Sequence, residues 1–96
     1  MKILAIEKEI ESTDWSNADQ ILKDEARQAY RLVLAGSMRE MYFTEEHIAV
    51  LILEADNLDR AREILGTLPL VKAGMIEFDV MELRPYTGFG RIMEGV

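Results

Sequence analysis

The stretch from Gly66 to Leu83 restricts the fold of this 96-residue chain more than any other part of it. It reads GTLPLVKAGMIEFDVMEL and joins a helix stop, a proline turn and a strand. Because proline lacks a backbone donor and disfavours helical geometry in the residue before it, we expect a fixed turn at Thr67–Lys72. The strand predicted over residues 73–83 alternates in polarity, with an apolar face made by Ile76, Phe78 and Val80.

Three further segments carry strand patterns. Residues 1–10 and 47–55 are short, nearly unbroken apolar runs, which is typical of strands that are buried on both faces. Residues 37–44 alternate as an edge strand does. The chain therefore supplies four strands, two of them suited to the middle of a sheet.

Two segments carry the apolar spacing of amphipathic helices. The first is expected from Ala18 to near Gly36, after a cap at Ser16 or Asn17. The second is expected to follow Asp56 or Asn57 and to end at Gly66. The resulting order is β-α-β-β-α-β.

That order predicts an α+β, ferredoxin-like fold, a four-stranded antiparallel sheet with both helices on one face and the first and third strands in the middle. Two helices cover only one sheet face, so the apolar residues of the other face need a second molecule. We therefore predict a homodimer, sheet against sheet, built from one domain over residues 1–84. The alternative is that the C-terminal arm, residues 85–96, covers that face in the same chain.

Composition excludes several classes of function. The net charge is −7, and without a basic run we expect neither nucleic acid nor a membrane surface as a partner. The chain has no cysteine, which excludes disulfides and thiolate chemistry, and it has no apolar run of membrane-spanning length. The apolar run near the start of the chain spans only four residues, which is too short for the core of a signal peptide, so we expect a cytoplasmic protein.

Several short motifs resemble the muconolactone isomerase-like proteins of the dimeric α/β-barrel superfamily. The resemblance runs from about Ala18 to Leu83. It is carried by Glu25, Ala29 and Leu32 of the first helix, Gly36 and Arg39 after it, His47, the Leu68-Pro69-Leu70 turn, and Ile76-Glu77. The resemblance implies that two sheets close into a barrel in the dimer, that small organic ligands bind in or beside it, and that higher homo-oligomers occur.

The second strand departs from the isomerase pattern. Where the family has a cluster of the form Arg-His-x-Trp-Arg, this chain has Arg39-Glu40-Met41-Tyr42-Phe43. One basic residue is kept. Arg39 is accordingly our candidate for binding a substrate carboxylate in bidentate fashion, and Tyr42 offers a hydroxyl and a flat ring beside it. The alternatives are an exposed ion pair for Arg39, with Glu40 or Glu46, and an amphipathic core position for Tyr42.

Two residues are our candidates for proton transfer. His47 is the only histidine of the chain, and an unperturbed imidazole titrates near pH ~6.5, so it suits a general base. Glu77 is the second candidate, within an acidic group that includes Glu7 and Asp79 as substrate-binding residues. The first and last strands are neighbours in this fold, so Glu7, Glu77 and Asp79 are expected to share a sheet face. The alternatives are an exposed histidine at the start of a strand and carboxylates that face water.

Two functions from different classes follow. The first is a small enzyme that binds an organic acid or lactone and isomerises it by acid-base chemistry without a cofactor or metal. The second is a catalytically silent dimeric module that binds a small molecule or only assembles. A cofactor-free oxygenase is a third, weaker alternative, since that chemistry also occurs on related barrels.

Overall fold

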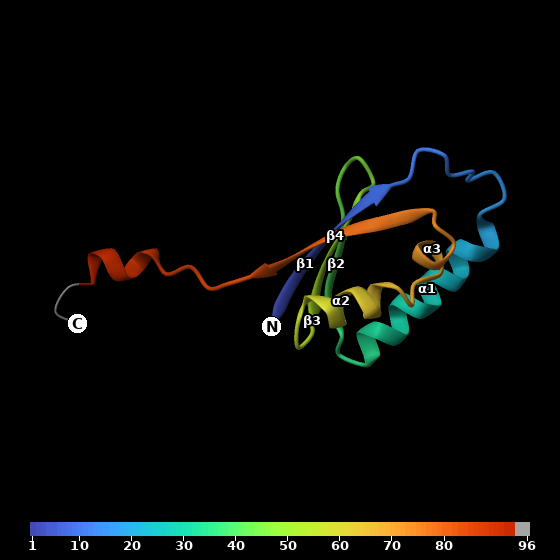
Figure 1. Cartoon of the computed structure of the whole chain (residues 1–96). Coiled ribbons are helices and arrows are strands. Elements are labelled where there is room, and N and C mark those ends of the chain that lie inside the picture. The colour runs from blue at the N-terminus through green and yellow to red at the C-terminus, as the bar shows by residue number, and fades with distance from the viewer. Residues whose placement is uncertain (94–96) are drawn as a thin grey trace.

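The computed structural model describes residues 1–93, as four strands with helices packed against them (Figure 1). The strands are β1 (Lys2–Glu9), β2 (Met38–Phe43), β3 (Ala49–Glu54) and β4 (Ile76–Leu83). The helices are α1 (Asp19–Leu34), α2 (Leu58–Leu65) and α3 (Pro69–Lys72), and a 3-10 helix, η1 (Gly88–Ile92), lies in the arm. Apart from α3 and η1, the order is the predicted β-α-β-β-α-β.

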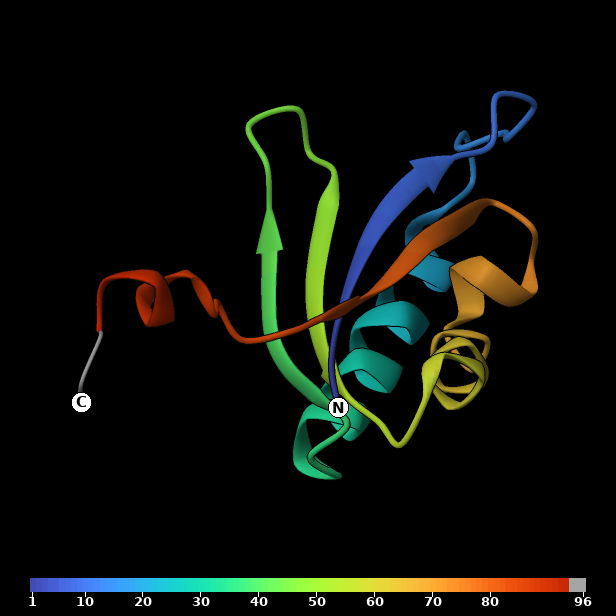
Figure 2. The same cartoon turned by 60° about the vertical axis from the view of Figure 1, so that its left-hand side comes forward.

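The sheet is antiparallel with the strand order β2-β3-β1-β4. The first and third strands, β1 and β3, are central, as their apolar sequences predict. The three α-helices lie together on one face of the sheet (Figures 1 and 2). The predicted α+β, ferredoxin-like class is confirmed.

The core lies between the helices and the sheet. Its largest fully buried side chains are Ile3, Met38, Leu53 and Leu68. Leu32 of α1 and Ile64 and Leu65 of α2 complete it from the helix side. No buried side chain of the described residues is polar or charged, so burial of apolar surface is what holds the two layers together.

Helix α1 ends as predicted, at Gly36. Gly36 adopts φ +81°, and the Ser37 amide donates to the Leu32 carbonyl over 3.0 Å. The Gly36 amide also donates to the Val33 carbonyl, which makes a Schellman motif. The predicted N-cap of this helix was wrong: Ala18 is the cap residue and it makes no side-chain hydrogen bond. For α2 the expected cap is Asn57, whose side chain accepts from the Arg60 amide over 2.7 Å.

The turn expected at Thr67–Lys72 contains a short helix instead. Pro69 occupies the first turn of α3, where a missing amide costs nothing, and Leu68 before it is extended (φ −71°, ψ 129°). Both constraints of proline are therefore obeyed. The prediction of a fixed turn was wrong because a proline that stops one helix also favours the start of the next.

The register of β1 against β4 separates the two faces of the sheet. Glu7 lies opposite Phe78, whereas Lys8 lies opposite Glu77 and Ile6 opposite Asp79. Phe78 packs on the core, so Glu7 points to the helix face. Glu77 and Asp79 point to the other face, which we call the open face. The expectation that the three carboxylates share a face was therefore wrong. A shift of one residue in the register moves a side chain to the other face, and Glu7 lies on the helix face while Glu77 and Asp79 lie on the open face.

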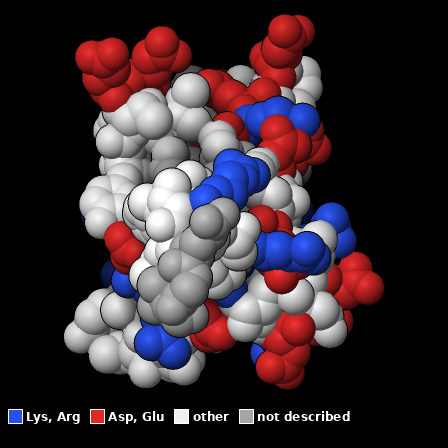
Figure 3. All heavy atoms as spheres, turned by 90° about the vertical axis from the view of Figure 1, so that its left-hand side faces the viewer, with Lys and Arg blue, Asp and Glu red and all other residues white. Residues whose placement is uncertain are grey.

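The open face carries apolar side chains without a cover in the described chain. They are the half-buried Leu4, Ile6, Val50 and Ile52 on the central strands, and the exposed Tyr42, Met81 and Leu83 on the edges. Residues 84–93 of the arm do not fold back over them; they run away from the sheet on the side opposite the helices (Figures 1 and 2). Figure 3 looks onto this side and shows mostly uncharged side chains to the left of the arm, with acidic groups along the upper rim.

None of the helices in the described residues has both the length and the apolar character that crossing a membrane requires.

Candidate functional site: a cavity between the helices and the sheet

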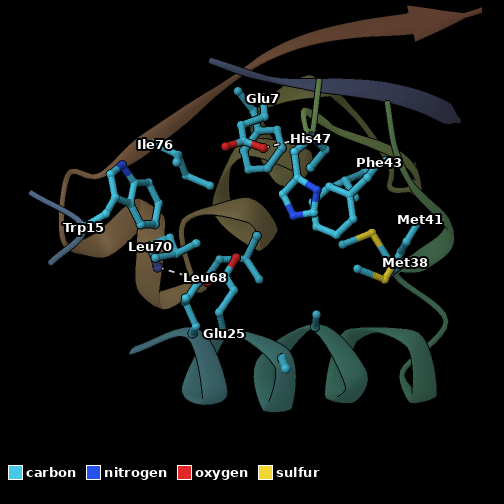
Figure 4. Close-up of a pocket in the computed structure, with 16 residues that line it drawn as sticks. Glu7, Trp15, Glu25, Met38, Met41, Phe43, His47, Leu68, Leu70 and Ile76 are labelled. Atoms are coloured by element: carbon cyan, nitrogen blue, oxygen red, sulfur yellow. Dashed lines mark hydrogen bonds between the residues drawn. The ribbon is translucent and has the colours of Figure 1, made fainter. Parts of the chain in front are cut away.

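A cavity of about 350 Å³ lies between α1 and the sheet, at the end of the sheet where β1 and β2 finish and β3 and β4 begin (Figure 4). That volume is within the range of small-molecule sites. Most of the lining is apolar, including Met38, Leu51, Leu68, Leu70 and Phe78. Three groups able to exchange protons, Glu7, Glu25 and His47, also face into it.

The sequence of α1 explains why side chains do not fill this space. Beside Leu22 and Glu25, α1 lines the cavity with Ala26 and Ala29, and neither alanine has a side chain long enough to reach the sheet. One turn further on, Leu32 is buried and the layers close. The exposed lining residues come from α1 and from the β2–β3 hairpin, so the cavity opens between these two elements.

Glu7 is held by a backbone amide of the neighbouring strand. Its Oε1 accepts from the Ala49 amide over 2.8 Å, just beyond the last β1–β3 pair, which joins Ile6 to Val50. The Glu7 side chain thus gives the Ala49 amide an acceptor where the backbone hydrogen bonds between β1 and β3 end. This hydrogen bond fixes one carboxylate oxygen and leaves Oε2 available to the cavity.

Glu25 approaches the same space from α1. Its Oε1 accepts from the Leu70 amide over 3.0 Å, at the start of α3. Burial raises the pKa of Glu25 and the negative charge of Glu7 adds to this, while the Leu70 hydrogen bond acts in the opposite direction. Glu25 therefore holds a proton more readily than an ordinary glutamate, as a general acid or base requires.

His47 stands at the mouth of the cavity in the β2–β3 turn. Its ring stacks on Phe43, with ring centroids 4.2 Å apart and planes 8° from parallel. Its backbone has φ +66°, which is rare for a residue other than glycine, and its amide donates to the Thr44 carbonyl over 2.8 Å. The turn and the stacked ring fix the imidazole so that it faces Glu7 and Glu25 (Figure 4).

The charges of the cavity have one sign. No lysine or arginine is among its lining residues in the described chain, and neither Glu7 nor Glu25 takes part in an ion pair there. Trp15 borders the cavity, but its indole N–H is used by Glu9 Oε1 at 2.7 Å. A bound ligand therefore meets acceptor oxygens and one imidazole within apolar walls.

The structure divides the six site residues predicted from sequence. His47 and Glu7 line the cavity. Glu77 and Asp79 lie on the open face, where Lys8 Nζ is 3.9 Å from Glu77 and 3.2 Å from Asp79. The two alternative candidates for proton transfer, His47 and Glu77, therefore lie on opposite sides of the sheet.

The two other predicted binding residues also lie outside the cavity. Tyr42 is on the open face and donates its hydroxyl to Glu40 Oε1 over 2.8 Å, which raises the pKa of the tyrosine. Arg39 is exposed at the start of β2, close enough to help lower the pKa of Glu54, after the hydrogen bond from the N-terminal ammonium. Glu54 ends β3, so Arg39 and His47 stand at opposite ends of the sheet.

Glu25 was missed as a site residue, although the sequence holds a signal for it. It is four residues after Ile21 and four before Ala29, which places an acidic side chain within the apolar stripe of α1. An acidic residue on a core-facing stripe predicts either a structural hydrogen bond or a site. Glu25 has the structural hydrogen bond, from the Leu70 amide, and it also lines the cavity, which is the candidate site.

No group of three or more histidine and carboxylate side chains with metal-binding geometry occurs within residues 1–93.

The strand order and the helices on one face define a ferredoxin-like α+β domain. The structure of muconolactone isomerase is similar to this one, with a TM-score of 0.71 and 18% sequence identity over 91% of this chain and 92% of that chain. The structure of 5-chloro-2-hydroxyhydroquinone dehydrochlorinase from Burkholderia phenoliruptrix, in complex with 2,5-dihydroxybenzoquinone, is similar with a TM-score of 0.60 and 16% identity, over 92% and 98% of the two chains. The resemblance in fold predicted from sequence is thereby confirmed.

No protein-family model matches the sequence, and no curated protein sequence is significantly similar to it.

Proposed function

We propose that this protein binds a small, uncharged cyclic molecule in the cavity and moves a proton on it, as a cofactor-free acid-base enzyme related to muconolactone isomerase. The observation that supports the proposal is the convergence of Glu7, Glu25 and His47 on one apolar cavity of about 350 Å³. The names of the two proteins of similar fold indicate that both act on small ring compounds.

The lining favours an uncharged ligand over a carboxylate. A ligand carboxylate would lie beside Glu7 and Glu25 in a space of low dielectric, where like charges repel strongly, and no lysine or arginine of the lining offsets them. The second oxygens of the two glutamates accept hydrogen bonds, so they match ligand hydroxyl groups. Of the two ligand classes predicted from sequence, the lactone is therefore favoured over the organic acid, and the cavity extends this class to uncharged hydroxylated rings.

In the proposed reaction, Glu25 exchanges a proton with the ring. Its carboxylate removes a proton from a carbon next to a carbonyl, and Glu25, after exchange with solvent, returns a proton to a different carbon of the conjugated system. A ring N–H of His47 donates to the carbonyl oxygen while negative charge develops on it. One proton leaves and one returns, so the isomerisation balances without an oxidant or reductant. Glu7 orients a ligand hydroxyl.

Binding is tested by thermal shifts with a panel of uncharged lactones, hydroxylated quinones and their carboxylated analogues. We expect the uncharged members to raise the melting temperature of the wild type, because a ligand that binds only the folded state stabilises it. Glu25→Gln should lose most of this shift, and the matched surface variant Glu63→Gln, on α2, should keep it. Shifts produced only by the carboxylated analogues would overturn the proposed ligand class.

Catalysis is tested separately, by NMR of a bound ligand in heavy water. We expect deuterium to enter the ring carbon with the wild type and not with Glu25→Gln. Binding without deuterium exchange would leave the catalytically silent binding module as the function of this chain.

The protein is further proposed to be a homodimer, with two open faces packed together. Leu4, Ile6, Val50 and Ile52 pair across β1 and β3 and form an apolar stripe that is only half-buried in the described chain. A stable interface of this kind buries on the order of 1,200–2,000 Å² in total. Light scattering after size exclusion should give twice the chain mass of 11.0 kDa, and a monomer at all concentrations would contradict the proposal.

A further inference from the structure

The cavity is larger than a single small ring requires. An apolar cavity of about 150 Å³ is enough to hold benzene, whereas this one measures about 350 Å³. Figure 4 shows Glu7, Glu25 and His47 facing one another in one part of it. The rest of the volume is therefore available to a part of the ligand that does not react.

Trp15, in the loop between β1 and α1, is the aromatic residue of the described lining that is free to contact such a part. Phe43 is already stacked on His47, and Phe78 packs against the core. In Figure 4, Trp15 lies with Leu70 and Ile76 at the end of the cavity away from Phe43. The spare volume that has an unoccupied aromatic wall is therefore the Trp15 end.

Hydrogen bonds hold Trp15 in place. Its indole N–H donates to Glu9 Oε1 over 2.7 Å, and Glu9 lies opposite Ile76 in the sheet. Earlier in the loop, the Thr13 hydroxyl donates to the Met75 carbonyl over 3.0 Å. Because Glu9 satisfies the polar edge of the indole, the carbon surface of the ring is what remains for a ligand. Such a surface favours offset-stacked or edge-to-face contact with another aromatic ring.

The surroundings of Trp15 in the cavity are apolar. Leu22, near the start of α1, lines the cavity together with Leu70 and Ile76. The Leu70 amide donates to Glu25, so this apolar end begins directly beside the candidate acid-base group. A hydrocarbon ring gains free energy from burial there, whereas a polar group would lose its hydration without gaining hydrogen bonds.

We propose that Trp15, with Leu22, Leu70 and Ile76, forms a second subsite that binds an apolar ring of the ligand. The ligand is then an uncharged lactone or hydroxylated ring that carries a second, unreactive aromatic ring. This inference rests on the function proposed above and adds to it the size and polarity of the substrate. Trp15 determines specificity and takes no part in proton transfer.

Two lactones that differ by one ring test the subsite. Butenolide has a single ring, and γ-phenylbutenolide carries a phenyl group on the same lactone; both are uncharged. We expect γ-phenylbutenolide to bind the wild type about tenfold or more tightly, because even one methylene in an apolar pocket gives about tenfold discrimination. Isothermal titration calorimetry measures both dissociation constants.

Variants at Trp15 assign this preference to the subsite. Trp15→Ala should raise the dissociation constant of γ-phenylbutenolide about tenfold and leave that of butenolide unchanged, whereas Trp15→Phe keeps a flat ring and should keep most of the preference. The control is Tyr30→Ala, which removes a ring that is 64% exposed on α1 and outside the cavity lining. It should affect neither lactone. An equal loss of both lactones in Trp15→Ala would overturn the subsite.

Fluorescence gives an independent readout, since Trp15 is the only tryptophan of the chain. We expect saturating γ-phenylbutenolide to change the tryptophan emission and saturating butenolide to leave it nearly unchanged. Equal affinities for the two lactones, with unchanged emission, would overturn the subsite and leave the proposed function standing. No binding of either lactone would overturn the lactone class proposed above and this inference with it.

Discussion

The two faces of the sheet are built from the same four strands, yet they differ in what they hold. The helix face is closed by α1, α2 and α3 and contains the core and the cavity. The open face carries an apolar stripe at the centre and the Lys8, Glu77 and Asp79 cluster near one end. Strand alternation alone assigns a residue to one face or the other, so neighbouring residues serve different purposes: Glu7 faces a ligand site and Lys8 faces the exterior.

The largest contrast is expected between Leu53 and Ile52, neighbours in β3. Leu53 is fully buried on the helix face, and truncation of such a residue leaves a cavity in the core. We expect Leu53→Ala to lower the free energy of unfolding by about 2–5 kcal/mol. Chemical denaturation monitored by circular dichroism measures this. A loss no larger than that of Ile52→Ala would mean that the helix face is not the better-packed one.

A charge at Ile52 distinguishes the faces in another way. Ile52 is half-buried on the open face, and Asp in its place would be desolvated only in a dimer. We expect Ile52→Asp to weaken self-association by about a hundredfold or more, since an unpaired buried charge costs several kcal/mol. The subunit should stay folded by circular dichroism. Sedimentation velocity measures the association, and an unchanged dimer would exclude the open face as the interface.

A smaller effect is expected at Glu25, and it depends on pH. Because its pKa is raised in the folded state, folding favours the protonated form, and stability falls as the pH rises through the folded pKa. Glu25→Gln removes this loss. The variant should therefore melt at a higher temperature than the wild type near neutral pH, and the difference should shrink as the pH falls below the ordinary glutamate pKa of about 4.3. Melting curves of both proteins across this pH range measure the difference in melting temperature. A difference that grows toward acid pH would contradict the predicted direction of the effect.

The smallest effects are expected at the open-face charges. Lys8, Glu77 and Asp79 are all more than half exposed, and surface ion pairs contribute about 0–1 kcal/mol. We expect Glu77→Gln to change the free energy of unfolding by less than about 0.5 kcal/mol and to keep the ligand-induced thermal shift. Loss of that thermal shift would show that Glu77 contributes to ligand binding, as the sequence predicted.

The sequence was sufficient for the fold because its signals are local and periodic. Helical spacing in α1, the glycine at Gly36 and the two apolar runs of β1 and β3 each determine an element, and the order of elements determines the sheet. The site is different in kind. Glu7 and Glu25 are 18 positions apart in sequence, and only the packing of α1 over the end of the sheet brings them to one cavity.

Two errors show where sequence reasoning stopped. Neighbouring strands were paired correctly, but the exact register of β1 against β4 decides the face of Glu7 relative to Asp79, and no turn in the sequence sets that register. Arg39 was assigned to a ligand because it matches a basic residue of the family pattern and suits a carboxylate, whereas its distance from His47 follows from the length of β2. Chemistry read from residue types needs the positions that tertiary structure supplies.

The left-handed backbone of His47 has a consequence for substitution at this position. Most side chains are strained at φ +66°, while asparagine, aspartate and glycine tolerate it. An alanine variant would thus combine loss of the imidazole with a distorted hairpin. Asparagine keeps the turn and removes only the titratable ring, so it is the substitution that isolates the imidazole's contribution. For the same reason, homologous chains that have abandoned the histidine are expected to carry asparagine, aspartate or glycine in its place.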